Sequence, residues 1–364
     1  MIHAMTEDRV YNFSAGPSVL PEEVLQRARA EMMNHGGSGM SVMEMSHRSP
    51  AFAGIFAETK EKLRRMLRVP DSHEILFLQG GATLQFAAIP MNLMEGETAD
   101  YAVTGNFSAK AAKEAEKYGT VHLACDAREN AYTRIPAQDE LVLTPGARYL
   151  YYCANNTVYG TAWPYIPAAD APLVCDMSSE ILSRPVDVSR YGLLYAGAQK
   201  NMAPAGLTVV ILDRALAGHA LPFTPEIMRY DTMIRNDSML NPPPCWCIYM
   251  LSLVLDWLGT QGGVEGMAEI KKARAARLYA FLDESRLFRP QAERSSRSDM
   301  NVTFRTGDEA LDADFIRFAA DRGLVNLKGH KVAGGMRASL YNAMPIEGVD
   351  KLIETMKEFE QNHV

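Results

Sequence analysis

The stretch Tyr195-Ala-Gly-Ala-Gln-Lys-Asn-Met-Ala-Pro-Ala-Gly-Leu-Thr-Val-Val-Ile211 places one lysine, Lys200, in a turn between two apolar segments. Residues 193–196 and 207–212 are short and apolar, as buried strands are. Small and turn-forming residues between them let the backbone bend tightly. A lysine held among such residues loses hydration, which favours the neutral amine that can attack an aldehyde. The alternative is a solvated lysine at a strand end, and the local sequence leaves both interpretations open.

Composition sets limits on the class of protein. A chain of 364 residues is long enough for a large core and favours two lobes over one. It has 37 Lys and Arg against 44 Asp and Glu, which gives a net charge of −7 and a pI of about 5.7. This balance argues against a nucleic acid or an anionic membrane surface as the main partner.

The cysteines and the apolar segments indicate the compartment. Five cysteines are scattered without the paired spacing of a zinc site, so we expect reduced core residues and no metal. The first ten residues contain no apolar core of a signal peptide, and the apolar segment 246–258 is shorter than the ~20 residues of a membrane span. We therefore expect a cytoplasmic protein.

From residue 74 onward, short apolar strands alternate with helices. Near-continuous apolar strands of this kind predict a mainly parallel sheet covered on both faces, with ligands at the carboxyl ends of its strands. The helix expected at 107–118 is amphipathic, with Lys110, Lys113, Glu114 and Lys117 facing outward. The expected strands are 74–78, 101–104, 121–125, 149–153, 173–175 and 193–196, and a further helix is expected at 84–94.

Gly259-Thr-Gln-Gly-Gly263 is the best domain boundary. It divides the chain into a large domain, residues 18–260, and a small α+β domain, residues 261–364. Strands are expected in the small domain at 301–304, 324–327 and 336–341, and helices at 311–322 and after Pro345. Residues 1–17 form an arm that we expect to pack near the active site.

Three features fall at the ends of expected strands: Lys200, the turn Gly80-Gly-Ala-Thr83 and Asp176. Gly80-Gly-Ala-Thr83 precedes a helix whose free N–H groups can bind a phosphate, although such turns are also common as plain fold geometry. Asp176 follows a buried strand, either as a cap or as an acceptor for a protonated ring nitrogen. A carboxylate for a pyridinium nitrogen, a Schiff-base lysine and a phosphate-binding helix are together what pyridoxal phosphate requires.

Longer segments agree with this chemistry, and through them nearly the whole chain resembles the phosphoserine aminotransferases, which are class V aminotransferases dependent on pyridoxal phosphate. The segments are Asn12-Phe-Ser-Ala-Gly-Pro17, Met45-Ser-His-Arg48, Gln85-Phe-Ala-Ala-Ile-Pro90, Leu182-Ser-Arg-Pro-Val-Asp-Val-Ser-Arg-Tyr191, 195–207 and Gly334-Gly-Met-Arg-Ala-Ser-Leu-Tyr-Asn-Ala-Met-Pro345. The resemblance implies an α/β fold of fold type I, with a mainly parallel seven-stranded sheet in the large domain. It also implies a homodimer with active sites at the subunit interface.

The resemblance further implies the roles of individual residues. Lys200 and Asp176 are the expected catalytic pair, as Schiff-base lysine and pyridine-nitrogen partner. Other cofactor contacts are expected from Ala82, Thr83, Phe107, Thr157, Gln199, Asn241 and Pro242, with Asn241 reaching the phosphate of the other subunit. Ser14 and Arg337 are expected to bind substrate, Arg337 through the α-carboxylate. His47 and Arg48, with His330 and Lys331 of the partner subunit, are expected to hold the distal phosphate or carboxylate.

The chain also departs from the pattern at four positions. Phe107 stands where many members have tryptophan, which keeps stacking but removes an N–H donor. Thr83 and Lys331 stand where arginine is frequent, and Pro242 where threonine is common. Lysine binds phosphate as a point charge without the bidentate fork of arginine, so the role of Lys331 is open.

The expected reaction is amino transfer between L-glutamate and 3-phosphohydroxypyruvate, giving O-phospho-L-serine and 2-oxoglutarate. Another class V aminotransferase, of the serine– or alanine–glyoxylate type, is the alternative enzyme. The basic residues expected around the substrate argue against it, because a small uncharged side chain needs no such counter-charge. A protein that binds pyridoxal phosphate or senses phosphate without catalysis is the alternative outside enzymes, and it would have no need of Lys200.

Overall fold

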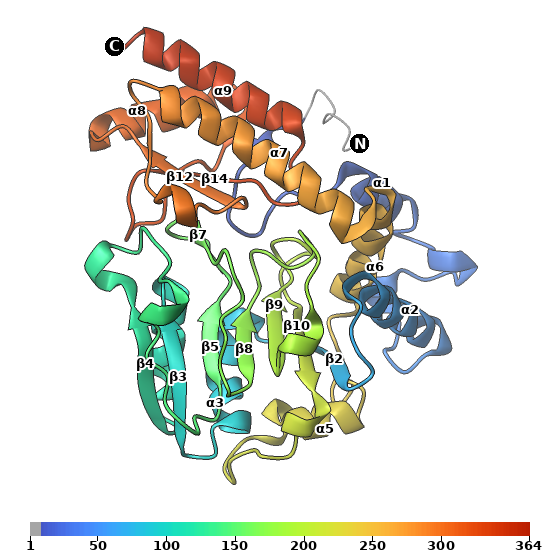
Figure 1. The fold of residues 1–364 in the computed structure, drawn as a ribbon. Helices are drawn as coiled ribbons and strands as arrows, with labels where there is room; N and C mark the ends of the chain where they lie inside the picture. Colours follow the sequence, from blue (N-terminus) through green and yellow to red (C-terminus); the bar gives the residue numbers. More distant parts are fainter. Residues whose placement is uncertain (1–8) are drawn as a thin grey trace.

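A seven-stranded sheet runs through the larger part of the chain in the computed structural model, which describes residues 9–364 (Figure 1). β10 runs antiparallel to both of its neighbours, and the other strands share one direction. The mainly parallel sheet is therefore confirmed. In spatial order the strands are β2 (His73–Leu78), β10 (Thr208–Asp213), β9 (Leu193–Gly197), β8 (Leu173–Asp176), β5 (Leu150–Cys153), β3 (Thr98–Val103) and β4 (Thr120–Asp126).

Helices cover both faces of this sheet, because successive side chains of each buried strand point to opposite sides. In β2, Ile75 and Phe77 pack into one apolar cluster and Leu76 and Leu78 into the other. The first cluster includes α2 (Pro50–Leu67) and α6 (Cys245–Thr260), with α1 (Glu22–Ala30) beyond them. The second includes α3 (Gly81–Leu93), α4 (Asn106–Ala115) and α5 (Tyr230–Arg235).

The C-terminal part of the chain forms a smaller layer above the carboxyl ends of the parallel strands (Figure 1). The long helices α7 (Gly263–Glu284) and α9 (Ile346–Gln361) lie side by side over a three-stranded sheet. That sheet contains β11 (Arg289–Pro290), β12 (Asn301–Arg305) and β14 (Met336–Ser339), and α8 (Glu309–Ala320) packs beside it. A division of the chain at 260/261 remains a proposal.

The N-terminal segment joins this smaller layer to the lysine turn. β1 (Tyr11–Asn12) pairs in parallel with β13 (Leu324–Val325). The Ser18 N–H then donates to the Gln199 carbonyl at 2.9 Å, and the Ser18 hydroxyl donates to the Lys200 carbonyl. Residues 9–17 of the expected arm thus lead directly to the lysine, and residues 1–8 lie outside the described residues.

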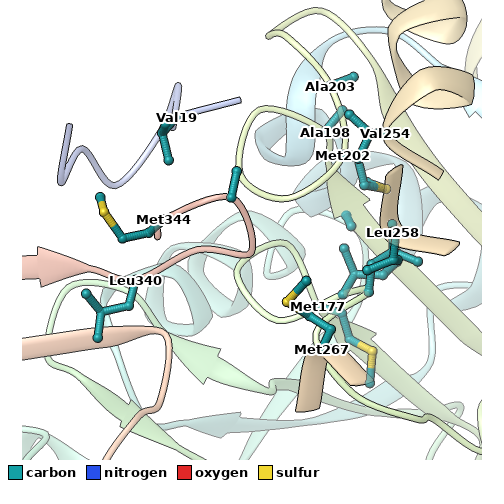
Figure 2. Close-up of a cluster of buried hydrophobic side chains, with 14 of the residues drawn as sticks. Val19, Met177, Ala198, Met202, Ala203, Val254, Leu258, Met267, Leu340 and Met344 are labelled. Carbon is teal, nitrogen blue, oxygen red and sulfur yellow. The ribbon is translucent and has the colours of Figure 1, made fainter. Parts of the chain in front are cut away.

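An apolar cluster packs around the lysine turn (Figure 2). Ala198 and Met202 of the turn are fully buried and belong to the same cluster as α6 and α7. Methionine fills irregular space well, which suits a region where two lobes and a tight turn meet. The labelled members are Val19, Met177, Ala198, Met202, Ala203, Val254, Leu258, Met267, Leu340 and Met344.

Several expected boundaries shift for local reasons. The helix expected from residue 84 begins at Gly81, because Gly80 takes a left-handed conformation with φ 90° and forms the N-cap. The strand expected at 324–327 ends after Val325, since Asn326 has φ 65°. The helix expected to reach residue 118 ends at Ala115, and the strand expected to reach 341 ends at Ser339. None of the described helices is long and apolar enough to cross a membrane.

Candidate active site

Lys200 lies three residues beyond β9, at the edge of the sheet where the parallel strands end. Its Nζ donates to the Thr157 hydroxyl at 2.9 Å and lies 5.5 Å from the centre of the Phe107 ring. Thr157 is 3% exposed, so the bond holds the amine in one place. This chain therefore brings together Lys200, Thr157 and Phe107, three of the residues expected at one site.

Asp176 is the last residue of β8, which pairs with β9, the strand that leads to Lys200. Its side chain is buried, with 5% of the residue exposed. Its Oδ1 accepts from the Ser178 N–H at 2.8 Å and its Oδ2 from the Tyr195 hydroxyl at 3.1 Å. Tyr151 lies behind Tyr195, with their hydroxyl oxygens 2.7 Å apart. Burial raises the pKa of both tyrosines well above the usual value, so Tyr195 stays protonated and can donate. A carboxylate with two fixed donors keeps lone pairs for a further donor in the site.

The first turn of α3 holds Ala82 and Thr83 and leaves its N–H groups free of any side-chain cap. A Cβ on Gly80 would lie 2.8 Å from Leu84 Cβ, so this tight turn requires glycine. At the start of α4, by contrast, the Ser108 hydroxyl accepts from the N–H groups of Thr104 and Gly105 at 3.1 Å. An uncapped N-terminus at the sheet edge suits a phosphate group.

Arg337 of β14 approaches the same place from the smaller layer. Its Nη1 donates to the Thr157 carbonyl at 3.3 Å, while its buried Nε has no partner among the described residues. Burial lowers the pKa of the Arg337 guanidinium, and among the described residues Tyr341 offsets this effect only in part while no carboxylate contributes. A buried cation without a counter-charge is costly unless a ligand supplies one.

His330 and Lys331 lie in the loop that precedes β14, near Arg337 of the same chain. Burial lowers the pKa of His330, and the positive charges of Arg337, Lys110 and Lys331 lower it further. We expected His330 and Lys331 of the partner subunit to join His47 and Arg48. That assignment stays a prediction, and within this chain the His330 loop lies next to Arg337, which donates to the Thr157 carbonyl.

His47 and Arg48 lie in the turn that leads into α2, directly before its N-cap Ser49. Arg48 is exposed, and the buried His47 Nε2 has no partner among the described residues. Asn241 and Pro242 are exposed as well. The Pro242 carbonyl accepts from Gln79 Nε2 at 2.7 Å, so this segment lies at the outer side of the turn before α3.

The N-terminal arm passes over the lysine. A Cβ on Gly16 would lie 3.4 Å from the Cγ atoms of both Gln199 and Lys200. Ser14 lies two residues earlier and accepts the Gly16 N–H at 3.4 Å. The Tyr341 hydroxyl holds the arm by donating to the Ala15 carbonyl at 2.9 Å. The arm thus lies against Gln199 and Lys200 at Gly16, and Ser14 is two residues before that contact.

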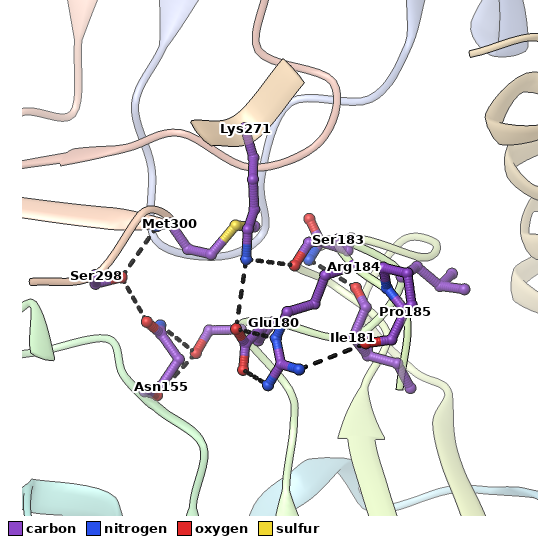
Figure 3. A network of polar contacts seen from close by, with 12 residues as sticks. Asn155, Glu180, Ile181, Ser183, Arg184, Pro185, Lys271, Ser298 and Met300 are labelled. Carbon is purple, nitrogen blue, oxygen red and sulfur yellow. Dashed lines mark hydrogen bonds and ion pairs between the residues drawn. The ribbon is translucent and has the colours of Figure 1, made fainter. Parts of the chain in front are cut away.

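A buried ionic network joins α7 of the smaller layer to the loop that follows β8 (Figure 3). Lys271 of α7 donates from Nζ to Glu180 Oε1 at 3.4 Å and to the Ser183 hydroxyl at 3.3 Å. Arg184 Nε donates to the same Glu180 oxygen at 2.8 Å. Burial raises the pKa of Glu180, but the charges of Arg184 and Lys271 outweigh burial and lower it overall. Because Glu180 follows Asp176 in the same loop, the network anchors that loop to the smaller lobe.

Two residues near the site were not expected there. Tyr195 counted only as a strand residue, although a tyrosine in a buried strand needs a partner for its hydroxyl. Lys110 was placed on the outer face of α4, yet its Nζ lies 5.8 Å from the centre of the Phe107 ring. The spacing of three residues between Phe107 and Lys110 on a helix is the signal that pointed to this contact.

Comparison with known proteins agrees with this geometry. The family described as aminotransferase class-V matches residues 10–352. The phosphoserine aminotransferase of Bacillus cereus is 49% identical over 355 residues, covering 97% of this chain and 99% of that protein. The phosphoserine aminotransferase of Aromatoleum aromaticum is 50% identical over 359 residues, with 96% and 98% covered.

Solved structures are similar over the same extent. Phosphoserine aminotransferase from Bacillus circulans subsp. alkalophilus is 42% identical with a TM-score of 0.96, covering 98% of this chain and 100% of that one. The phosphoserine aminotransferase from Trichomonas vaginalis, solved with pyridoxal phosphate bound, is 40% identical with a TM-score of 0.92, with 96% and 100% covered. On fold, sequence and the place of Lys200, the chain belongs to the class-V aminotransferase family.

Proposed function

We propose that this class V aminotransferase is a phosphoserine aminotransferase, which moves an amino group between L-glutamate and 3-phosphohydroxypyruvate in serine biosynthesis. The observation that carries the proposal is a group of basic side chains: Arg337 and Lys200 meet at Thr157, and His330 and Lys331 lie near Arg337. Within residues 9–364, no carboxylate forms an ion pair with any of them. Both substrates carry two anionic groups, which is the charge that such a site lacks.

Pyridoxal phosphate is the cofactor of this family, and the residues present fit it. Lys200 would hold it covalently and Phe107 would stack on its ring. Asp176 would hold the ring nitrogen with the acceptor capacity that Ser178 and Tyr195 leave free. The uncapped first turn of α3, with Ala82 and Thr83, would hold the phosphate. When bound, the cofactor supplies an aldehyde for the amino group and a ring that withdraws electrons from the reacting carbon.

The chain's own residues then supply orientation and proton transfer. The Arg337 guanidinium binds the substrate α-carboxylate, which satisfies its buried charge. Thr157 lies between Arg337 and Lys200, because its carbonyl accepts from one and its hydroxyl from the other. The substrate's α-carbon is thereby held near the Lys200 amine, which removes and returns the proton at that carbon.

A homodimer completes the proposal. His47, Arg48, Asn241 and Pro242 are all at least partly exposed. The family resemblance assigns Asn241 to the cofactor phosphate of the other subunit, so active sites at the subunit interface are part of the proposal. All five cysteines are free, in keeping with the cytoplasm as the place of action.

Amino transfer from glutamate tests the proposal, with 3-phosphohydroxypyruvate compared with pyruvate and glyoxylate as acceptors. Each charge-assisted hydrogen bond to the distal phosphate contributes about 1.5–3 kcal/mol, so two such bonds favour the phosphorylated acceptor by at least about 100-fold in kcat/KM. Lys200→Ala should abolish turnover and covalent cofactor attachment. Equal use of the three acceptors would instead support the glyoxylate-type alternative.

A further inference from the structure

We propose that Lys110 of α4 is a further residue that binds the distal anionic group of the substrate and so contributes to specificity. The inference rests on the proposed function and deepens it. Lys110 joins a subsite with His330 and Lys331 of the same chain, with one side from α4 and the other from the loop before β14. Its occupant is a phosphate or carboxylate group at the far end of the substrate.

The ion pairs of α4 single out Lys110. Lys113 Nζ lies 2.5 Å from Glu116 Oε2, and Lys117 Nζ lies 2.7 Å from Glu114 Oε2. These two lysines are part of a solvated, neutralised helix surface. Lys110 is one turn earlier and forms no ion pair with any described carboxylate. Its exposed ammonium therefore lacks the counter-charge that its neighbours on the same helix have.

The position of Lys110 is set by Phe107. The two residues are three apart on α4 and so lie on one face of the helix. The Lys110 and Lys200 ammonium groups lie 5.8 Å and 5.5 Å from the centre of the Phe107 ring. The two ammonium groups are therefore no more than about 11 Å apart, which places a second cation within the length of a substrate held near Lys200.

The other side of the subsite comes from the loop before β14. The Val332 N–H donates to His330 Nδ1 at 3.3 Å, so the neutral ring carries its proton on Nε2, ready to donate to an anion. The loop is closed at its base by the Gly329 N–H, which donates to the Gly335 carbonyl at 2.9 Å. Arg337, Lys110 and Lys331 are the charged groups that act on His330. An anion between α4 and this loop would relieve the mutual repulsion of all these cations.

Lys110 also accounts for a departure from the family pattern. Lys331 stands where arginine is frequent, so this chain has one bidentate donor fewer for the distal group. A lysine acts as a point charge, and a second ammonium on the opposite side offsets the missing fork. In this chain, the distal anionic group of the substrate is bound by the charges of Lys110 and Lys331 on opposite sides, where an arginine would bind it with one bidentate fork.

Two variants of the full-length holoenzyme test the proposal, Lys110→Met and the matched control Lys113→Met on the same helix. With glutamate as donor, Lys110→Met should lower kcat/KM for 3-phosphohydroxypyruvate by roughly 10- to 100-fold, the value of one charge-assisted contact. Use of pyruvate, which has no distal anion, should stay within about twofold. Lys110→Arg should restore most of the loss, and Lys113→Met should change neither substrate.

The titration of His330, followed by NMR, gives a second readout. Removal of the Lys110 charge should raise the pKa of His330 toward its ordinary value, because one of the three repelling charges is gone. The inference is overturned if Lys110→Met leaves the preference for the phosphorylated acceptor unchanged, or lowers the use of both acceptors equally. An unchanged His330 titration would also overturn it. If the wild-type enzyme itself shows no preference for the phosphorylated acceptor, the proposed function fails instead.

Discussion

The ionic network between the lobes makes one quantitative prediction about stability. Glu180 and Lys271 are each 6% exposed, and Arg184 joins them through the same carboxylate. We compare two substitutions, Glu180→Gln and Lys271→Met. Both remove the link between α7 and the loop that follows Asp176, but they leave different charges behind.

The two substitutions should differ in cost. Glu180→Gln leaves Lys271 and Arg184 facing a neutral amide, and an uncompensated buried charge costs about 3–5 kcal/mol. After Lys271→Met, Arg184 still holds Glu180 through bonds of 2.8 and 3.2 Å. Only the weaker contacts of Lys271 at 3.4 and 3.3 Å are lost, which costs about 1–2 kcal/mol.

Thermal unfolding of the two variants measures the difference. In a chain of this size each kcal/mol shifts Tm by about 2 °C, so Glu180→Gln should lower Tm by about 6–10 °C and Lys271→Met by about 2–4 °C. Lys113→Met, whose side chain is 80% exposed, should leave Tm unchanged and serves as control. Equal shifts, or a larger shift for Lys271→Met, would refute the view that Arg184 compensates Glu180.

The same network predicts a pH dependence. Burial raises the pKa of Glu180, but Arg184 and Lys271 lower it below the ordinary value of 4.5 overall. A carboxylate with a lowered folded pKa stabilises the fold fully above its unfolded pKa, and this contribution is lost as the pH falls through the folded pKa. The wild type should therefore lose more stability than Glu180→Gln between pH 6 and about 3. Parallel pH curves for the two proteins would contradict this assignment.

Four further substitutions have expected outcomes. Gly105→Ala places a Cβ 2.9 Å from Cγ of Asn156, whose Nδ2 donates to Thr104 and Thr161. It should therefore lower the free energy of unfolding, measured in urea, by about 1–3 kcal/mol. Gly54→Ala, which meets open space in α2, should raise it by about 0.5–1 kcal/mol. Arg274, which is 1% exposed, donates to the carbonyls of Tyr341, Asn342 and Met344. Arg274→Met removes these bonds and should lower the free energy of unfolding by about 3 kcal/mol or more. A fall in Tm of less than 2 °C would argue against a structural role for Arg274. Tyr195→Phe removes one of the two donors to Asp176 and should weaken cofactor binding, measured by equilibrium titration, by about fivefold. Unchanged affinity would show that Ser178 alone orients the carboxylate.

Local sequence was sufficient for much of the fold. Strands 74–78 and 193–196 were predicted from short apolar runs, and both lie in the seven-stranded sheet. Turn residues around Gly80 and Gly197 marked where strands end. These features depend on neighbours a few residues apart, so composition and period reveal them. The chemistry of Lys200 and Asp176 followed because parallel strands bring their carboxyl ends to one edge.

Contacts between distant segments could not be read in this way. The sequence suggested a solvated Lys110 on the outer face of its helix, whereas the Lys110 charge acts on His330 and its Nζ lies 5.8 Å from the centre of the Phe107 ring. The direction of a side chain on an amphipathic helix follows from its period, but what lies opposite depends on how the lobes pack. The sequence by itself thus determined the α/β architecture and predicted the reactive lysine and its carboxylate partner. Only the tertiary structure decided which cations gather around Lys200, because their proximity arises from the packing of two lobes more than a hundred residues apart in the chain.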